Sequence, residues 1–178
     1  MFTYEGTSEL IKDCVERANH LIVNDVFLDE IRFRSFSMAT CTGEQIVDDI
    51  NNTPNNTPNN LHVRLYKSKN PFTSSLGYYS PSTPNDIFLN SRKLNRSKGS
   101  IVSTLIHEWI HYCDDCNTHE SYGHGDNSPI GKENTAPFLI DNIAESIVDD
   151  KTPNYNDTIN SNITYYVPWY KRILRWFR

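Results

Sequence analysis

The chain has 178 residues, enough for one domain with a hydrophobic core and a terminal tail. A hydrophobic fraction of 37% excludes a disordered chain, and a formal net charge of −5 excludes a protein whose whole surface binds nucleic acid. The N-terminus has no basic region followed by an apolar run, and no stretch approaches the roughly 18 apolar residues of a membrane span. We therefore expect a soluble protein that is cytoplasmic or exported by a non-classical route.

The first third of the chain predicts one helix and one strand. Residues 8–22 carry apolar side chains at helical spacing, and Ser8 belongs to the residue types that cap helix N-termini. Residues 26–36 alternate between apolar and polar from Ile31 onward, which predicts a strand. Residues 51–60 repeat asparagine, threonine and proline, so we expect an exposed loop there.

Two short strands are expected in the middle of the chain. Apolar and more polar residues alternate over 61–66, which is the pattern of a half-buried strand. A turn-rich stretch follows over 68–85. The short apolar run 87–89 then predicts a brief second strand.

Residues 100–112 carry the strongest helical pattern. At about 100° per residue, one broad side of this helix is apolar and the other holds a narrow polar stripe. The stripe contains Ser103, Thr104, His107 and His111. A second helix is predicted over 137–149. Together the elements predict an α+β domain over residues 1–150, in which a small mixed sheet packs on the helix that carries the histidines.

The polar stripe has the composition of a metal site. His107 and His111 are four residues apart, so both imidazoles project from one helix face and can reach a single ion. Zn²⁺ suits two imidazole nitrogens and a third protein ligand, with one position left for a water whose pKa the metal lowers. Glu108 follows the first histidine and is placed to act as the general base for that water.

The sequence offers three candidates for the third ligand. His124 lies between two glycines, which let the backbone approach a metal closely, and we favour it. Glu145, on the second predicted helix, is the main alternative, and His119 is another. The ordinary interpretation of the two alternatives is a solvated helix residue and a solvated loop residue.

These residues resemble the zincin metallopeptidases. His107-Glu108-Trp109-Ile110-His111 matches the general HEXXH motif of that superfamily, and Gly123-His124-Gly125 looks like the SprT-like (Spartan-type) branch. Upstream, Leu76-Gly77-Tyr78-Tyr79 and Ile87-Phe88-Leu89-Asn90 are similar to the Gly-aromatic strand and the edge strand that precede the metal helix in this branch. The resemblance covers residues 61–130. It implies a zincin-like fold, peptide-bond hydrolysis on a protein or peptide substrate, zinc bound by His107, His111 and His124, and Glu108 as general base.

The sequence also predicts roles for a tyrosine, a pair of cysteines and the C-terminal tail. Tyr122 is the nearest tyrosine in sequence that can stabilise an oxyanion, although a packing role is the ordinary interpretation. Cys113 and Cys116 suit a disulfide, a redox pair or two reduced thiols. Residues 151–178 form a tail whose last ten residues hold four basic side chains and no acid. That end suits an anionic membrane surface or nucleic acid, or docks as a helix on the acidic domain.

The sequence leaves the biochemical class open between two kinds of protein. The favoured hypothesis is a zinc metalloendopeptidase, which includes a toxin-like effector protease with a narrow target. The alternative is a non-catalytic zinc-binding or degenerate zincin interaction module. Glu108 separates them, because a purely structural zinc site needs no general base.

Overall fold

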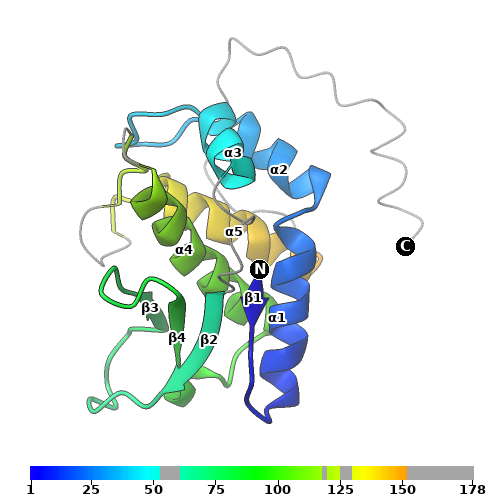
Figure 1. Cartoon of the computed structure of the whole chain (residues 1–178), viewed down its shortest axis with the longest axis vertical. Helices are drawn as coiled ribbons and strands as arrows, with labels where there is room; N and C mark the ends of the chain where they lie inside the picture. Colours follow the sequence, from blue (N-terminus) through cyan, green and yellow to red (C-terminus); the bar gives the residue numbers. More distant parts are fainter. Residues whose placement is uncertain (53–60, 118–119, 125–129, 152–178) are drawn as a thin grey trace.

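The computed structural model describes residues 1–52, 61–117, 120–124 and 130–151. These residues form an α+β fold, as the sequence predicts, with helices on a small mixed sheet (Figure 1). The helices are α1 (Glu9–Leu21), α2 (Asp25–Arg32), α3 (Gly43–Asn52), α4 (Lys98–Cys116) and α5 (Ala136–Val148), with a 3₁₀ turn η1 (Ser91–Lys93). The strands are β1 (Phe2–Thr3), β2 (Leu61–Tyr66), β3 (Gly77–Tyr79) and β4 (Asp86–Asn90).

The sheet has the strand order β1-β2-β4-β3. Strands β1, β2 and β4 are parallel, and β3 pairs antiparallel with β4. The resemblance to SprT-like proteins gave the edge position to residues 87–90. The structure corrects this, because β4 lies inside the sheet and β3 lies at its edge.

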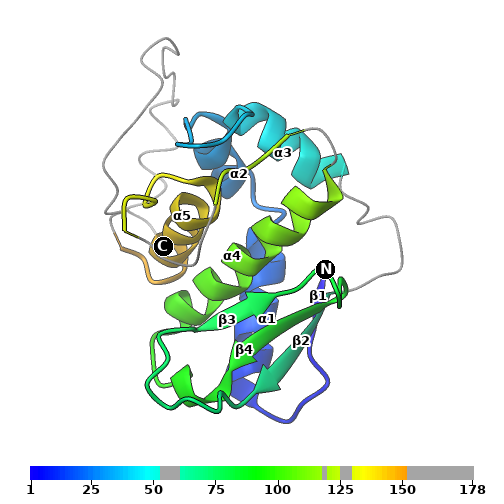
Figure 2. The ribbon, with the colours of Figure 1, turned by 90° about the vertical axis from the view of Figure 1, so that its left-hand side faces the viewer.

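Helix α4 runs through the middle of the molecule, with α5 on one side and the sheet on the other (Figure 2). It contacts α1, α5, β3 and β4, which explains why its sequence is apolar around most of its circumference. The helix is longer than the predicted 100–112. It begins after Ser97, whose hydroxyl accepts a hydrogen bond from the Ser100 N–H at 3.0 Å.

The prediction of a strand over 26–36 is wrong. Residues 25–32 form α2, which the Asn24 side chain caps by accepting from the N–H groups of Val26 and Phe27. The alternation that begins at Ile31 is real, but Phe27, Leu28 and Ile31 are the buried residues, and their spacing is that of a helix.

The other predicted elements are confirmed with small shifts of their ends. Helix α1 begins after Ser8, although the Ser8 side chain makes no capping hydrogen bond. The helix predicted over 137–149 is α5, shifted by one residue at each end. The turn-rich stretch contains β3. Residues 51 and 52 end α3, whereas the rest of the predicted loop and the tail from 152 onward lie outside the described residues. None of the described helices has the length and apolar character needed to cross a membrane.

Candidate metal centre

Three histidines meet beside the central helix. His107 and His111 project from α4, and His124 reaches them from the segment 120–124. One ligand atom from each imidazole lies within 4.8 Å of the other two. Zinc binds imidazole nitrogens at about 2.0–2.1 Å, which sets tetrahedral ligands roughly 3.3 Å apart, so small side-chain rotations close the set. The three residues can therefore hold a metal ion.

Helix α5 supplies the surroundings of the cluster. The Asp141 carboxylate lies 2.7 Å from Nδ1 of His107, which fixes the ring and leaves Nε2 for a metal. The Phe138 ring packs against His107 at 4.7 Å between centroids and stacks on His124 at 5.1 Å. This ring shields the histidines from water on one side, and Nε2 of His124 is itself buried.

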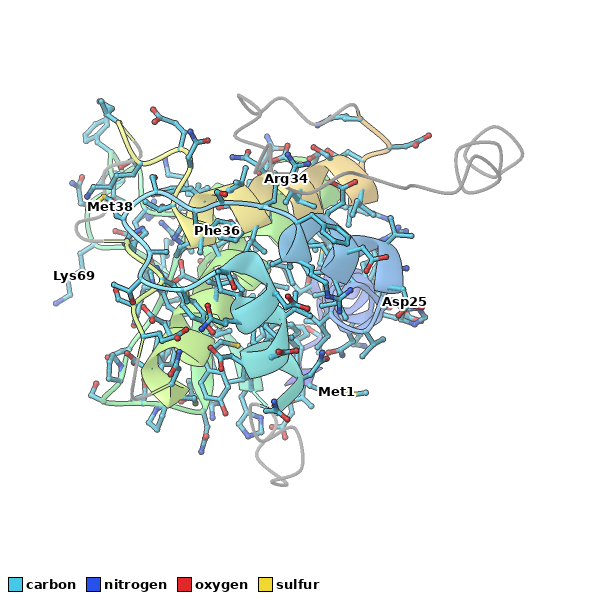
Figure 3. The ribbon with its side chains drawn as sticks, turned by 90° about the horizontal axis from the view of Figure 1, so that it is seen from above. Met1, Asp25, Arg34, Phe36, Met38 and Lys69 are labelled. Carbon is cyan, nitrogen blue, oxygen red and sulfur yellow. The ribbon has the colours of Figure 1, made fainter. Side chains whose placement is uncertain are left out.

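The segment that carries His124 is held at several points. The Ser121 carbonyl accepts from the Thr40 N–H at 2.9 Å, and the Tyr122 N–H donates to the Asp114 carboxylate at 3.0 Å. Gly123 has φ +74°, and a Cβ there would lie 2.4 Å from the carbonyl carbon of Met38. Figure 3 labels Met38 on the loop between α2 and α3. The loop and the glycine together fix where His124 enters the cluster.

Glu108 faces the edge strand. Its side chain is 8% exposed, and Oε2 accepts a hydrogen bond from the Tyr79 N–H at 2.9 Å. Burial raises the pKa of this carboxyl, a shift that the neighbouring His107 and the Tyr79 N–H partly offset. Glu108 therefore lies between the first histidine and the backbone of β3.

The pKa shifts of the two helix histidines differ in direction. Burial lowers the pKa of His111 to about 3, and the neighbouring His107 and His124 add to this, so the ring is neutral at pH 7 and able to bind a metal. Burial also lowers the pKa of His107, but the bond with Asp141 outweighs it and the net shift is upward. Burial raises the pKa of Asp141 to about 6. The 2.7 Å contact between these two groups is that of a hydrogen bond in which His107 Nδ1 carries the proton and the Asp141 carboxylate accepts it.

The structure separates Glu145 from the histidine cluster. Glu145 lies one turn beyond Asp141 on α5, is absent from the histidine group and lies 3.3 Å from the Lys151 ammonium. His119 lies outside the described residues. The Tyr122 side chain is fully buried, and its hydroxyl donates to Asp49 at 3.0 Å, which supports the packing role over the oxyanion role.

None of the four cysteines, all of which lie in the described part of the chain, forms a disulfide. Cys113 is buried and Cys116 is exposed, and both lie in the last turns of α4. Of the three interpretations of the pair, two reduced thiols near a helix end describes the structure.

Sequence reasoning missed two contributors to the site. Asp141 is the single charged residue in the first nine positions of α5, where Asn142 is the one other polar side chain, and this isolation is a usable signal. The contact between Glu108 and the Tyr79 backbone has no signal in the sequence, because any residue at position 79 supplies an N–H.

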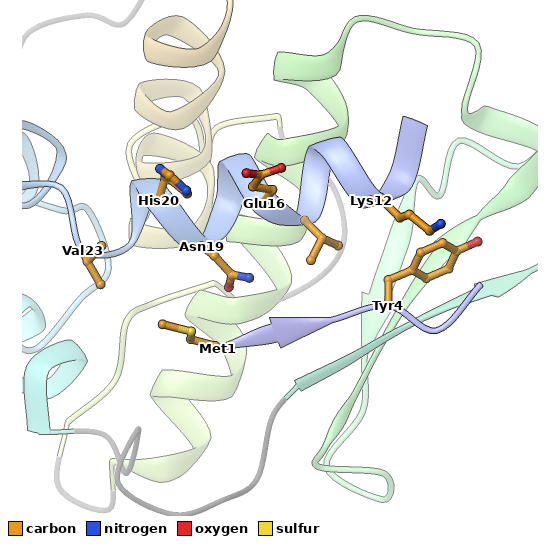
Figure 4. A pocket seen from close by; sticks show the side chains of 8 residues that line it. Met1, Tyr4, Lys12, Glu16, Asn19, His20 and Val23 are labelled. Carbon is orange, nitrogen blue, oxygen red and sulfur yellow. The ribbon is translucent and has the colours of Figure 1, made fainter. Parts of the chain in front are cut away.

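A separate open pocket of about 580 Å³ lies between β1 and α1, away from the histidines (Figure 4). Its lining is mostly apolar in area and includes Met1, Tyr4, Val15 and Val23. It shares no residue with the cluster.

Comparison with known proteins adds no relative to this picture. No protein-family model, no curated protein and no solved structure matches the chain.

Proposed function

We propose that the protein is a zinc-dependent metallopeptidase. The observation that carries the proposal is the convergence of His107, His111 and His124, with Glu108 adjacent to the first of them. Three imidazoles are a common protein ligand set for catalytic zinc, which leaves a position for water and lowers its pKa. Asp141 would hold His107 in the tautomer that binds the metal.

Glu108 is the proposed general base. Its raised pKa suits a group that accepts a proton from the attacking water and returns it to the leaving amine. The hydrogen bond from the Tyr79 N–H holds the carboxylate in place without neutralising it.

Strand β3 is the proposed binding element for the peptide. The Leu76 carbonyl accepts from the Asn90 N–H, so residues 76 and 78 pair with β4. By alternation, the backbone groups of Gly77 and Tyr79 point away from the sheet, and the Tyr79 N–H reaches Glu108 accordingly. An extended peptide added to this edge would place a peptide bond beside Glu108.

A non-catalytic zinc module is the second candidate. The low exposure of Glu108 favours it, because a buried carboxylate with a backbone partner also describes a structural residue. In this alternative, zinc would fasten the segment of His124 to α4 and no peptide bond would be hydrolysed.

One substitution separates the two candidates. Glu108→Gln keeps the shape and the acceptor oxygen for Tyr79 but removes the base. We expect zinc-loaded wild type to hydrolyse peptides in a proteome-derived library and Glu108→Gln to retain zinc while losing at least about 10²-fold in rate. Glu145→Gln, one turn beyond Asp141, is the control and should retain both zinc and activity. No cleavage by either protein would favour the module, and equal cleavage by both would contradict the role of Glu108 as general base.

A further inference from the structure

The pocket between β1 and α1 gathers exposed apolar side chains around a hollow (Figure 4). Its volume is about 580 Å³, and Met1 and Val23 line it with 60% and 66% of their surface exposed. Tyr4 and Val15 complete the apolar part of the lining. Apolar side chains left in water around a concave surface mark a place where another group binds.

Asn19 closes the free edge of β1 inside this pocket. Its Oδ1 accepts a hydrogen bond from the Phe2 N–H at 2.8 Å, and its Nδ2 donates to the Phe2 carbonyl at 2.9 Å. The other edge of β1 pairs with β2. An added strand would need the two Phe2 groups that Asn19 already occupies. The pocket therefore suits a segment that binds through side chains, such as an amphipathic helix, and not an extended peptide.

The pocket also holds a carboxylate that no neighbouring cation balances. Glu16 lines the pocket and forms no ion pair with any residue that the structure describes. Lys12, which lines the pocket as well, lies 2.7 Å from the Glu9 carboxylate on the same helix. An incoming segment with both apolar and basic side chains therefore matches this surface.

A second group of exposed apolar side chains has the opposite charge around it. Residues 61–98 contain seven Lys or Arg and one acid, a net charge of +6 in a chain whose total is −5. This segment exposes Leu65, Phe72, Leu76 and Tyr78. Because like charges repel, a basic segment is directed away from this second group and towards the pocket.

Residues 169–178, here called the tail segment, have the two properties that match the pocket. Trp169, Ile173 and Trp176 recur at the spacing of one helix face. The segment also contains four Lys or Arg and no acid. An amphipathic helix of this kind binds by laying its apolar side chains into a groove.

The described chain arrives beside α1 before the tail segment begins. Asp149, next to the end of α5, accepts a hydrogen bond from the N-terminal end of α4. Lys98 at that end lies 2.9 Å from the Asp13 carboxylate of α1. Residues 152–168 then provide 17 residues, which span at most about 60 Å when extended. A small domain is about 30 Å across, so the tail segment can reach the pocket of its own chain.

We propose that the pocket between β1 and α1 holds the tail segment of the same chain. The two tryptophans contact Met1 and Val23, and the basic residues lie beside Glu16. The tail segment thereby covers the apolar side chains that the pocket leaves in water. The pocket shares no residue with the histidine cluster, so this docking is independent of the proposed peptidase function.

Disulfide trapping tests where the tail segment lies. The full chain is prepared with Cys116→Ser, which removes the exposed thiol, and with Ile173→Cys in the tail segment. It also carries either Val23→Cys in the pocket or Leu76→Cys in the second apolar group, both at exposed positions. Docking predicts that the Val23→Cys protein forms an intramolecular disulfide at least about tenfold faster than the Leu76→Cys protein, because binding raises the local concentration above the level that the linker alone provides. Equal rates, faster trapping at position 76, or a disulfide that joins only two chains would overturn the proposal.

A charge placed in the pocket provides a second test on the full chain. Trp169 and Trp176 report on the tail segment, whereas Trp109 is 2% exposed and gives a constant background. Val23→Glu places a carboxylate against apolar rings and should weaken docking at least about tenfold, which raises acrylamide quenching and shifts tryptophan emission to the red. Leu76→Glu, the matched change outside the pocket, should leave both unchanged. Quenching that is the same in wild type and Val23→Glu would contradict the docking.

The charge of the pocket is tested separately. Glu16→Gln should weaken docking about two- to fivefold, the range of one exposed ion pair, and salt at about 0.5 M should remove the difference from wild type. Glu44→Gln removes an exposed carboxylate from α3, outside the pocket lining, and should have no effect. Equal effects of the two substitutions would contradict the role of Glu16.

Discussion

Asp141 decides which nitrogen of His107 is available to a metal. Its carboxylate contacts Nδ1, so Nε2 is the nitrogen left for a metal. Asp141→Asn removes the negative charge and allows the amide to present either a donor or an acceptor. We expect a 10–100-fold loss of zinc affinity, measured by competition with a chromogenic chelator.

The control for this change lies on the same helix. Glu145→Gln removes a carboxylate one turn away that contacts Lys151 and none of the described histidines. Its zinc affinity should equal that of wild type. A Glu145→Gln protein that loses zinc while Asp141→Asn keeps it would favour Glu145, the alternative to His124, as the third ligand.

Two glycines with the same backbone conformation provide a matched pair. Gly123 and Gly131 both have φ +74°, but only Gly123 has neighbours within 4 Å of where a Cβ would lie. Gly131→Ala should cost about 1–2 kcal/mol of unfolding free energy from the left-handed backbone alone. Gly123→Ala should cost more, because the new methyl meets the Met38 backbone, and should also weaken zinc binding. The unfolding free energy is measured by urea denaturation and the zinc affinity by chelator competition. Equal losses in the two variants would contradict the role of Gly123 and the Met38 loop in positioning His124.

The residues of the site differ in how far the sequence alone predicts their positions. The spacing of His107 and His111 fixes their common face, so the motif alone places them. His124 is predicted from the two glycines that flank it in the sequence. Proximity in sequence makes Tyr122 a candidate oxyanion stabiliser, but its buried side chain supports the packing role that is the ordinary interpretation. Asp141 was missed, since hydrogen bonds between helices depend on packing that one sequence does not display.

Among the elements, α4 depends on a carboxylate from α5. Asp149 accepts hydrogen bonds from the Gly99 N–H at 2.9 Å and from the Ser97 hydroxyl at 2.7 Å, at the positive end of the α4 dipole. Burial raises the pKa of Asp149, but the hydrogen bonds that its carboxylate accepts outweigh this and lower it. These hydrogen bonds fix the start of the helix that carries His107 and His111.

This capping carboxylate gives a prediction with a defined pH dependence. A lowered folded-state pKa means that the stabilisation is complete above the unfolded pKa of about 3.9 and is lost as the pH falls through the folded value. Asp149→Asn should therefore lower the unfolding free energy by about 1 kcal/mol at pH 7, and the difference from wild type should vanish towards pH 2. Asp150→Asn, which removes the next carboxylate, is the control. A difference that persists unchanged at pH 2 would contradict the role of the charge.

Element prediction succeeded where the pattern had one interpretation. The helices of residues 9–21, 98–116 and 136–148 and the strand of residues 61–66 follow their periodicity. Residues 26–36 failed because a short amphipathic helix and an alternating strand share several apolar positions, and the Asn24 cap decided the outcome. The position of β3 at the sheet edge could not be predicted, since strand order depends on long-range pairing.

For the whole molecule, zinc should couple to folding. The three ligands join α4 to a segment that also contacts α3, the loop before it and the start of α5, so the ion would bind the folded chain and not the unfolded one. Free zinc at about 100 times its Kd should add about 2.7 kcal/mol of stability. Removing it with a chelator should lower Tm by roughly 5–10 °C in differential scanning fluorimetry. His124→Ala should show no zinc-dependent shift, and a full shift in that variant would contradict the ligand set.

The central claim is that the histidine triad is a zinc site, and metal content measures it most directly. The measurement is zinc per chain, by mass spectrometry, on protein purified under reducing, chelator-free conditions. The triad predicts about one zinc in wild type and in Glu108→Gln, and none in His124→Ala. Wild-type protein that carries no metal under these conditions, or His124→Ala that retains it, would contradict the account.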